Sequence, residues 1–311
     1  MKKILVVAPQ YVGDSILVIP FLRQLRKAYP DSLIDVVSKN AGKLVLEGCP
    51  YIDNICLKDD LKPNFYEKAY ILKRSLSAAL LAKKLKIKDT VGFGGQFREF
   101  LLTKIVKYKG TSKHELEHFM DVLQADDIDI TDECLEYWIN DADVDFVQKY
   151  FTENKKKALI VTSSSTYVKN WTVDGFNDVI KFLNENNFEC FIVGTEKEKD
   201  FNNQFTGVKN LCGELTFGQI SALISKMDLV FGIDSGFCHM ASAFNKKTIA
   251  LFGSTSLTQW KLSGQNSHTL SLNLACSPCK KPKKCKNDFK CMKDFSSQFV
   301  IEYLKNNGLV E

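Results

Sequence analysis

The sequence has no long apolar run. No hydrophobic stretch approaches the roughly 18 residues that a membrane-spanning helix needs. The N-terminal MKKILVVAPQ has an apolar run only from Ile4 to Ala8, and Pro9 follows at once, so the run is too short for a signal peptide. We therefore expect a cytoplasmic protein whose ten cysteines are reduced.

A strong charge of either sign is also missing. The formal net charge is only +5, which suits an anionic ligand such as a nucleotide diphosphate, or loose contact with an anionic membrane surface, and does not call for nucleic acid. There is no low-complexity segment and no convincing internal repeat. With 45% hydrophobic and 25% charged residues, the composition is typical of a globular protein. A length of 311 residues is near the point at which chains divide into two domains.

Short, β-rich apolar runs alternate along the chain with segments of helical period. Nearly continuous apolar strands of this kind are typical of parallel sheets covered by helices on both faces. A polar helix and a lysine tract at 141–157 separate two such series. The sequence therefore predicts an α/β fold with two Rossmann-like domains facing a cleft, residues 1–152 and 153–311. The predicted strands are 3–8, 32–38, 68–72, 90–93, 158–162, 189–193, 229–233 and 248–252.

The first motif, VGDSILVIP, follows the first predicted strand. Ligands of such sheets lie beyond the carboxyl ends of the strands, so Asp14 would reach a ligand site, and Gly13 would allow a tight turn. A carboxylate there could take the proton from an attacking hydroxyl. Alternatively, Asp14 simply caps a helix that begins at Ser15.

The second motif, FGIDSGFCHMASAF, again places a tight turn between a strand and a helix. Asp234 can cap that helix, while Ser235 and Gly236 contribute backbone N–H groups that could bind a pyrophosphate. His239 lies one turn later on the same side, although it could equally be a hydrogen-bonded core histidine. Downstream, LFGSTS adds a second glycine turn with hydroxyls, among them that of Thr255.

The third motif, TSSSTYVKNW, opens the second domain. The hydroxyls of Thr162 and Ser163 suit phosphate oxygens, and Lys169 would add a point charge. The alternative is an ordinary solvated loop.

Taken in order, these motifs resemble glycosyltransferase family 9, and in particular the type II ADP-heptose:lipopolysaccharide heptosyltransferases. The resemblance covers nearly the whole chain, since it also includes KRSLSAALLAKKL, VGFGGQFRE and NLCGELT. It implies a GT-B fold, inversion at the anomeric carbon, no required metal or cofactor, and an ADP-heptose donor bound mainly by the C-terminal domain. It also implies a lipid-linked oligosaccharide acceptor, and hence peripheral contact with the inner membrane through basic residues of the N-terminal domain.

The resemblance also assigns roles to individual residues. Asp14 matches the family's catalytic base, Lys169 its donor-phosphate lysine and Glu214 the residue that binds the donor's ribose. Further positions match the donor signature (Asp234, Ser235, Gly236, His239) or fall in the acceptor-side segment (Lys73, Ser75). The sequence departs from the family where a Thr/Ser run replaces Pro-Gly before the lysine and where Asn170 replaces the usual Arg.

Other patterns point to rival functions. HELEH, from His114 to His118, matches the zinc-protease motif, but it lies at the start of a short helix without an evident third ligand, so we expect at least partly solvated histidines. Asp143-Val144-Asp145 lies in the polar helix rather than at a strand end, which disfavours a metal-binding D-x-D. GFGG lacks the spacing of a dinucleotide-binding loop. An epimerase or another GT-B enzyme with a different donor remains an alternative, as does a binding module without chemistry.

Two features near the C-terminus leave alternatives open. Cys276, Cys279, Cys285 and Cys291 have spacings that could hold a structural zinc or iron–sulfur site, although KKPKK between them could equally be a solvated basic loop and the cysteines free thiols. The amphipathic segment 295–304 predicts a last helix that could cross back to the N-terminal domain.

Overall fold

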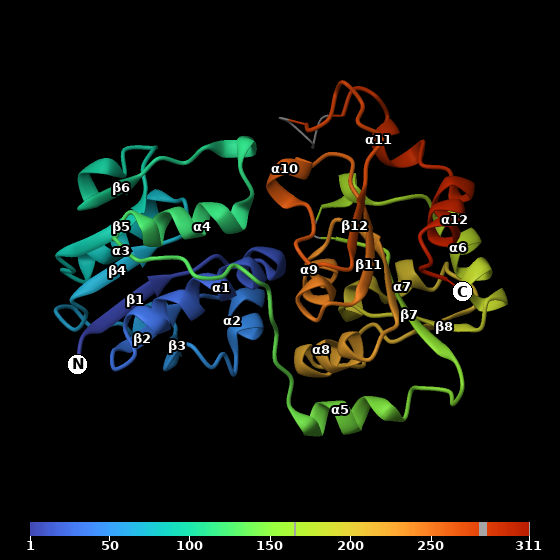
Figure 1. The fold of residues 1–311 in the computed structure, drawn as a ribbon, viewed down its shortest axis with the longest axis horizontal. Coiled ribbons are helices and arrows are strands. Elements are labelled where there is room, and N and C mark those ends of the chain that lie inside the picture. Colours follow the sequence, from blue (N-terminus) through green and yellow to red (C-terminus); the bar gives the residue numbers. More distant parts are fainter. Residues whose placement is uncertain (165, 280–284, 311) are drawn as a thin grey trace. The chain divides into compact units, whose positions relative to one another are not determined.

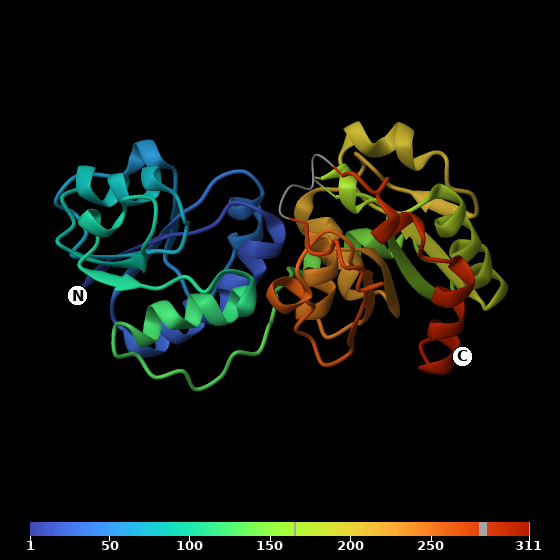
Figure 2. The ribbon, with the colours of Figure 1, turned by 90° about the horizontal axis from the view of Figure 1, so that it is seen from above.

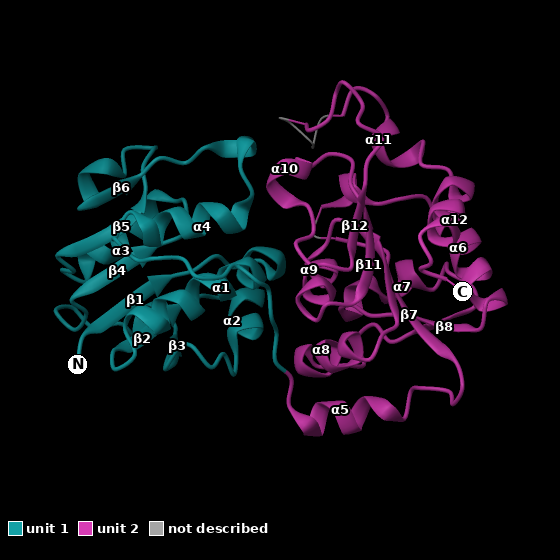
Figure 3. Cartoon of the chain, in the orientation of Figure 1, with its two compact units in different colours: residues 1–138 teal, residues 139–311 magenta. Residues whose placement is uncertain are grey.

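The chain forms two compact units, Met1–Trp138 and Ile139–Glu311 (Figure 3). The computed structural model describes residues 1–164, 166–279 and 285–310. The division falls earlier than the predicted boundary at 152. The reason is that the polar helix α5 (Asp141–Gln148) packs on α8 (Phe217–Ser225), so it belongs with the second unit.

The first unit contains a six-stranded parallel sheet in the order β3-β2-β1-β4-β5-β6. Helices α1 and α4 pack together on one face of it, and α3 lies on the other (Figures 1 and 2). Its strands are β1 (Lys3–Val7), β2 (Leu33–Val37), β3 (Asn54–Cys56), β4 (Lys68–Ile71), β5 (Asp89–Phe93) and β6 (Lys104–Val106). Its α-helices are α1 (Val12–Ala28), α2 (Ala41–Leu46), α3 (Leu76–Lys84) and α4 (Glu115–Gln124), and its 3₁₀ helices are η1 (Lys58–Asp60), η2 (Glu99–Leu101) and η3 (Gly110–Ser112).

The second unit repeats this plan with the order β12-β11-β10-β7-β8-β9, again all parallel. Its strands are β7 (Lys156–Val161), β8 (Phe188–Ile192), β9 (Val208–Asn210), β10 (Leu229–Ile233), β11 (Lys247–Leu251) and β12 (Ser267–Leu270). Besides α5 and α8, its helices are α6 (Val173–Glu185), α7 (Lys199–Asn202), α9 (Gly236–Ala243), α10 (Leu257–Trp260), α11 (Lys290–Lys293) and α12 (Ser297–Asn306), with 3₁₀ helices η4 (Tyr167–Lys169) and η5 (Glu196–Glu198). The predicted α/β class with two parallel sheets is thus confirmed.

The order of the strands reverses once in each sheet. In the first unit the chain moves outward from β1 to β3 and then returns to the other side of β1 with β4, so the reversal lies between β1 and β4. In the second unit it lies between β7 and β10. At such a point the connections leave in opposite directions, which opens a crevice at the carboxyl ends of the two strands. These two crevices are where ligands are expected.

The C-terminal helix α12 packs on α6 of its own unit. Its buried residues Val300 and Leu304 join the core of the second sheet, and the Lys247 ammonium donates a hydrogen bond to the Gly308 carbonyl. Throughout the described residues, no helix combines the length and the apolar character that crossing a membrane requires.

A buried ion network ties β4 and β6 to the end of α4. Asp126 accepts hydrogen bonds from the Lys68 and Lys104 ammonium groups at 2.7 and 2.9 Å and from the Tyr70 hydroxyl at 2.6 Å. The side chains of Lys68 and Asp126 are only 4% and 3% exposed. Burial alone would raise the pKa of the Asp126 carboxyl, but the hydrogen bonds from Lys68, Tyr70 and Lys104 lower that pKa below its usual value. The network therefore stabilises the folded state fully above the pKa of about 3.9 that Asp126 has in the unfolded chain. This stabilisation is lost as the pH falls through the lower pKa that Asp126 has in the folded protein.

Replacing Asp126 by asparagine should lower the free energy of unfolding by about 3 kcal/mol, because it leaves the buried Lys68 with Asp89 as its carboxylate partner. Urea unfolding at pH 7 measures the effect, and the difference from the parent should shrink toward pH 3. Asp127→Asn is the matched control, since Asp127 is almost fully exposed and lies 3.5 Å from Lys104. Equal unfolding midpoints for the two variants would contradict this account.

Candidate active site

Three loops of the second unit meet at the carboxyl edge of its sheet, after β7, β10 and β11. The Lys169 ammonium lies 2.7 Å from the Asp234 carboxylate, and the Thr255 hydroxyl donates to the same carboxylate oxygen at 2.5 Å. β7, β10 and β11 are neighbours in the sheet. The structure therefore brings together three of the predicted donor-site residues, from segments far apart in the chain. An ammonium at this edge can bind an anionic ligand.

The start of α9 forms the second part of this edge. Ser235 is the N-cap of α9, and Gly236 is its first residue. The prediction that Asp234 caps the helix is wrong, because its carboxylate is engaged by Lys169 and Thr255 instead. The Ser235 side chain makes no capping bond either. Since the first N–H groups of a helix have no partner inside the helix, they can donate to an anion here. His239 is buried in the first turn, with its backbone N–H 3.3 Å from the Ser235 carbonyl.

The remaining donor-side candidates are placed differently. The Thr162 hydroxyl donates to Asn202 at 2.6 Å, and the Ser163 hydroxyl to Glu198 at 2.5 Å, so both hold the loop after β7 against neighbouring segments of the unit. This differs from the expectation that these hydroxyls face phosphate oxygens. Glu214 is exposed in the turn after β9, next to Gly213 at φ +79°.

In the first unit the loops after β1 and β4 are joined at the strand reversal. The Lys73 ammonium donates to the Gln10 side-chain oxygen at 3.0 Å, and the Lys73 backbone N–H donates to the Val7 carbonyl at 3.2 Å. Burial lowers the pKa of Lys73, and the nearby Lys39 ammonium lowers it further. A partly desolvated cation next to another cation favours an anionic neighbour. Ser75 has a local role instead, because its hydroxyl accepts a hydrogen bond from the Ala78 N–H and caps α3.

Asp14 lies inside the first turn of α1 rather than at its N-cap. The helix begins at Val12, with Tyr11 as the N-cap, so the expectation of a helix starting at Ser15 is wrong. Gly13 is likewise helical, and the turn comes before it. A negatively charged side chain in the first turn interacts favourably with the helix dipole. Capping is therefore not the role of Asp14.

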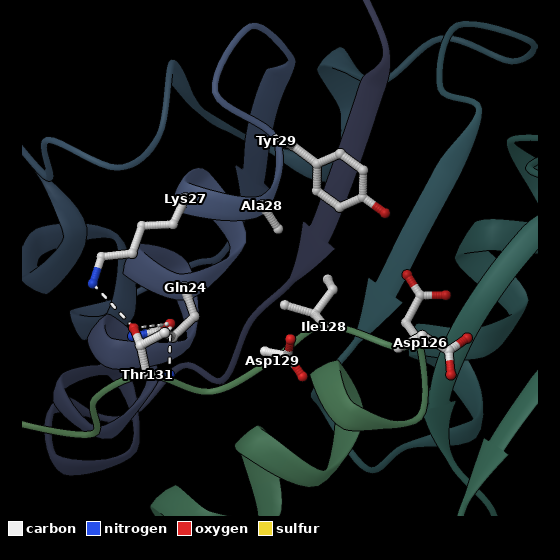
Figure 4. Close-up of a pocket in the computed structure, with 9 residues that line it drawn as sticks. Gln24, Lys27, Ala28, Tyr29, Asp126, Ile128, Asp129 and Thr131 are labelled. Carbon is white, nitrogen blue, oxygen red and sulfur yellow. Dashed lines mark hydrogen bonds between the residues drawn. The ribbon is translucent and has the colours of Figure 1, made fainter.

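An open hollow of about 620 Å³ lies at the carboxyl ends of β5 and β6 in the same unit, and its lining includes Arg74, Arg98, Lys107 and Tyr108. The Arg74 guanidinium is ion-paired with the fully buried Glu115 and lies 4.0 Å from the Tyr108 ring centre. Sequence reasoning missed the role of Glu115, because only the fold brings α4 beside the loop after β4. A second hollow of about 410 Å³ lies beside the last turn of α1, at the opposite end of that helix from Asp14 (Figure 4). It is therefore not part of the candidate site.

HELEH is a structural motif in this fold. His114 is the N-cap of α4, and its ring nitrogen accepts from the Leu116 N–H at 3.3 Å. His118 is fully buried, with Nε2 3.0 Å from the Gly110 carbonyl and its ring 4.4 Å from that of Tyr108. The expectation of partly solvated histidines is wrong, because both face the core. Asp143 lies in α5, where it bonds with the N-cap Asn140 rather than marking a strand end.

The four C-terminal cysteines form no disulfide bonds in the described part of the chain. Burial raises the pKa of Cys279, and it raises the pKa of Cys291 to about 11; the neighbouring cysteines of the group add to both shifts. Within the described parts of the chain, no three His, Cys, Asp or Glu side chains are grouped closely enough to hold a metal ion. The KKPKK segment lies outside the described residues.

Fold and site together define a GT-B glycosyltransferase, with two parallel-sheet units that each carry polar residues at the strand reversal. Lipooligosaccharide heptosyltransferase 2 of Campylobacter jejuni (serotype O:2) is 25% identical over 326 residues, covering 98% of both chains. The structure of E. coli ADP-heptose lps heptosyltransferase II superposes with a TM-score of 0.83 at 21% identity, covering 99% of this chain and 98% of that one. E. coli heptosyltransferase WaaC with ADP-2-deoxy-2-fluoro heptose gives a TM-score of 0.75 at 13% identity, covering 98% and 99%.

The chain belongs to glycosyltransferase family 9 (heptosyltransferase), whose sequence model matches residues 55–290. It is a glycosyltransferase, and the predicted resemblance is confirmed. The metalloprotease alternative has no support in either the fold or the family.

Proposed function

We propose that this enzyme transfers heptose, with inversion, from an ADP-heptose-type donor to a hydroxyl group of a lipopolysaccharide core acceptor, without a metal. The observation that carries the proposal is the ion pair of Lys169 with Asp234, which also accepts a hydrogen bond from Thr255, at the start of α9. This arrangement combines an ammonium with helix N–H groups, which suits a diphosphate. The names of the Campylobacter and E. coli relatives support the choice of sugar and acceptor.

The proposed reaction is a single displacement. The acceptor oxygen forms a bond to the anomeric carbon while the bond from that carbon to the β-phosphate oxygen of the donor breaks. Asp14 takes the proton of the attacking hydroxyl, and ADP leaves with the electron pair of the broken bond. Lys169 and the N–H groups at Ser235 and Gly236 stabilise the charge that develops on the departing diphosphate. Asp234 holds Lys169 in position before the donor binds. The donor phosphate then replaces Asp234 as the partner of Lys169.

Nucleotide preference tests the donor. At a concentration 100 times its Kd, the preferred nucleotide sugar should stabilise the protein by roughly 2.7 kcal/mol, which raises the Tm by about 5–10 °C. A thermal-shift panel of ADP-, UDP-, GDP- and CMP-sugars measures this, with Lys169→Ala as the variant that should lose most of the shift. A preference for UDP over ADP would sink the heptosyl assignment and leave the fold intact. Conversion of a free UDP-sugar without an acceptor would instead identify an epimerase.

We also propose that the enzyme works in the cytoplasm, in peripheral contact with the inner membrane. A lipid-linked acceptor is held at that surface, and basic residues near an anionic surface can each contribute about 1 kcal/mol. The segment from Lys73 to Lys109 contains ten Lys or Arg residues and only two acidic ones, Asp89 and Glu99. Not all of these cations face solvent, since Arg98 is buried and Arg74 and Lys104 are ion-paired.

A further inference from the structure

Two phenylalanines of the first unit, three positions apart in sequence, are exposed in the connection between β5 and β6. Phe97 is 81% exposed and Phe100 is 88% exposed. Elsewhere in the described chain, Met1 alone among the large hydrophobic residues reaches a similar exposure, and it is the first residue. Two such side chains within four residues form an apolar projection that the proposed chemistry does not use.

The turn that carries these phenylalanines is firmly held. Arg98, between them in sequence, is buried and donates to the carbonyls of Phe93 at 3.1 Å and Gly94 at 2.6 Å, and to the Gln96 side chain at 3.0 Å. The Glu99 carboxylate accepts a hydrogen bond from the Gly95 N–H. The turn is thus fixed from inside by a buried guanidinium.

The backbone at Phe97 is strained as well, with φ at +61°. A bulky residue in this region costs on the order of 1–3 kcal/mol and persists only where the surroundings impose it. Burying the ring does not offset this cost, because the ring is exposed. Neither the positive φ nor the exposure of Phe97 is explained by packing within the turn.

Further exposed apolar residues lie near the turn. Helix α3 packs on η2, and its Leu76 and Leu80, one turn apart, are also exposed, as is Ile105 on β6. Together with Phe97 and Phe100 they form what we call the apolar patch. Exposed lysines follow in the same segment, namely Lys83, Lys84, Lys86, Lys88, Lys107 and Lys109. Exposed aromatic and aliphatic side chains in a lysine-rich segment suit the interface of an anionic bilayer, where rings enter the headgroup region and ammonium groups meet phosphates.

We propose that the apolar patch docks on an anionic phospholipid bilayer, with Phe97 and Phe100 inserted into its interface. The inference rests on the proposed peripheral contact and adds the residues that make it. The hollow lined by Arg74, Arg98 and Lys107 is built partly from the same turn. Insertion of the two phenylalanines would therefore place the acceptor side of this unit at the membrane surface.

The test is co-sedimentation of the full chain with vesicles of phosphatidylcholine containing one third phosphatidylglycerol. Phe97→Ser and Phe100→Ser should each lower the partition coefficient about tenfold, and the double variant by more. Phe299→Ser is the matched control, an exposed phenylalanine on α12 that should bind like the parent. Raising the salt should weaken the binding of the parent, and vesicles of pure phosphatidylcholine should bind it poorly. Parent-like binding by the double variant, or no binding by the parent, would overturn the proposal.

Two further measurements separate this proposal from the proposed function. In Phe100→Trp, the added indole emission should shift to the blue when anionic vesicles are added, and no shift would contradict insertion. With a water-soluble, deacylated acceptor, the double Ser variant should transfer sugar at the same rate as the parent. With an acceptor embedded in vesicles, the rate of the double variant should be lower than that of the parent. Equal loss of activity on both acceptors would show that the turn serves the hollow lined by Arg74, Arg98 and Lys107 instead. Failure of the parent on both would count against the heptosyl assignment, independently of vesicle binding.

Discussion

Asp14→Asn should lower kcat by about 10²–10⁴-fold while leaving the donor Kd near that of the parent. Asparagine has the shape of aspartate but cannot accept the proton of the attacking hydroxyl. The donor groups identified above all lie in the second unit, so donor binding should change little.

Asp31→Asn is the control for this experiment, since Asp31 is an exposed carboxylate just beyond the other end of α1. It should be fully active. A near-normal kcat for folded Asp14→Asn would mean that this carboxylate only complements the helix dipole, which contributes about 0.3–1 kcal/mol to stability.

Lys169→Ala should lower kcat/KM by about 10²–10³-fold, comparable to the loss of one preorganised donor to a developing oxyanion. The lysine provides the positive charge that the three loops position at the sheet edge. Steady-state kinetics with a fixed acceptor and varied donor measures the loss. Lys181→Ala, an exposed lysine on α6, is the control and should behave like the parent.

Lys169→Ala should also lower the stability of the protein, because the substitution leaves the buried Asp234 without its ammonium partner. The double variant Lys169→Ala/Asp234→Asn resolves the two effects. It removes the uncompensated charge, so thermal stability should recover toward that of the parent while activity stays low. Recovery of activity together with stability would show that Lys169 acts only by holding Asp234.

The fold could be predicted largely because its central strands are continuous apolar runs. Every predicted strand is present in the structure. The four strands that the prediction missed are β3, β6, β9 and β12, which are the four edges of the two sheets. Each is only three or four residues long and partly exposed, so it lacks the apolar run that marks a central strand.

The site could be predicted less completely, because its contacts join distant segments. The loops after β1, β7, β10 and β11 were predicted, since strand ends can be located from the sequence. The start of α1 was misplaced because its N-cap, Tyr11, is not a residue type that signals a helix start. Asp234 is such a residue type, and its pairing with Lys169 depends on two strands being neighbours, which no local pattern encodes.

The strand reversals have a consequence for how this enzyme could diverge from its relatives. In the proposed mechanism the chemistry is carried by loops at one edge of each sheet, whereas the buried strands only have to remain apolar and β-forming. Loops can therefore exchange residues without disturbing the cores. A fold divided in this way tolerates many sequence changes. The TM-score of 0.83 with E. coli heptosyltransferase II, at only 21% sequence identity, agrees with such tolerance. The two units are separate compact bodies, and we propose that the donor preference is carried by one of them and the acceptor preference by the other. Selection could therefore alter one preference while the other stays unchanged.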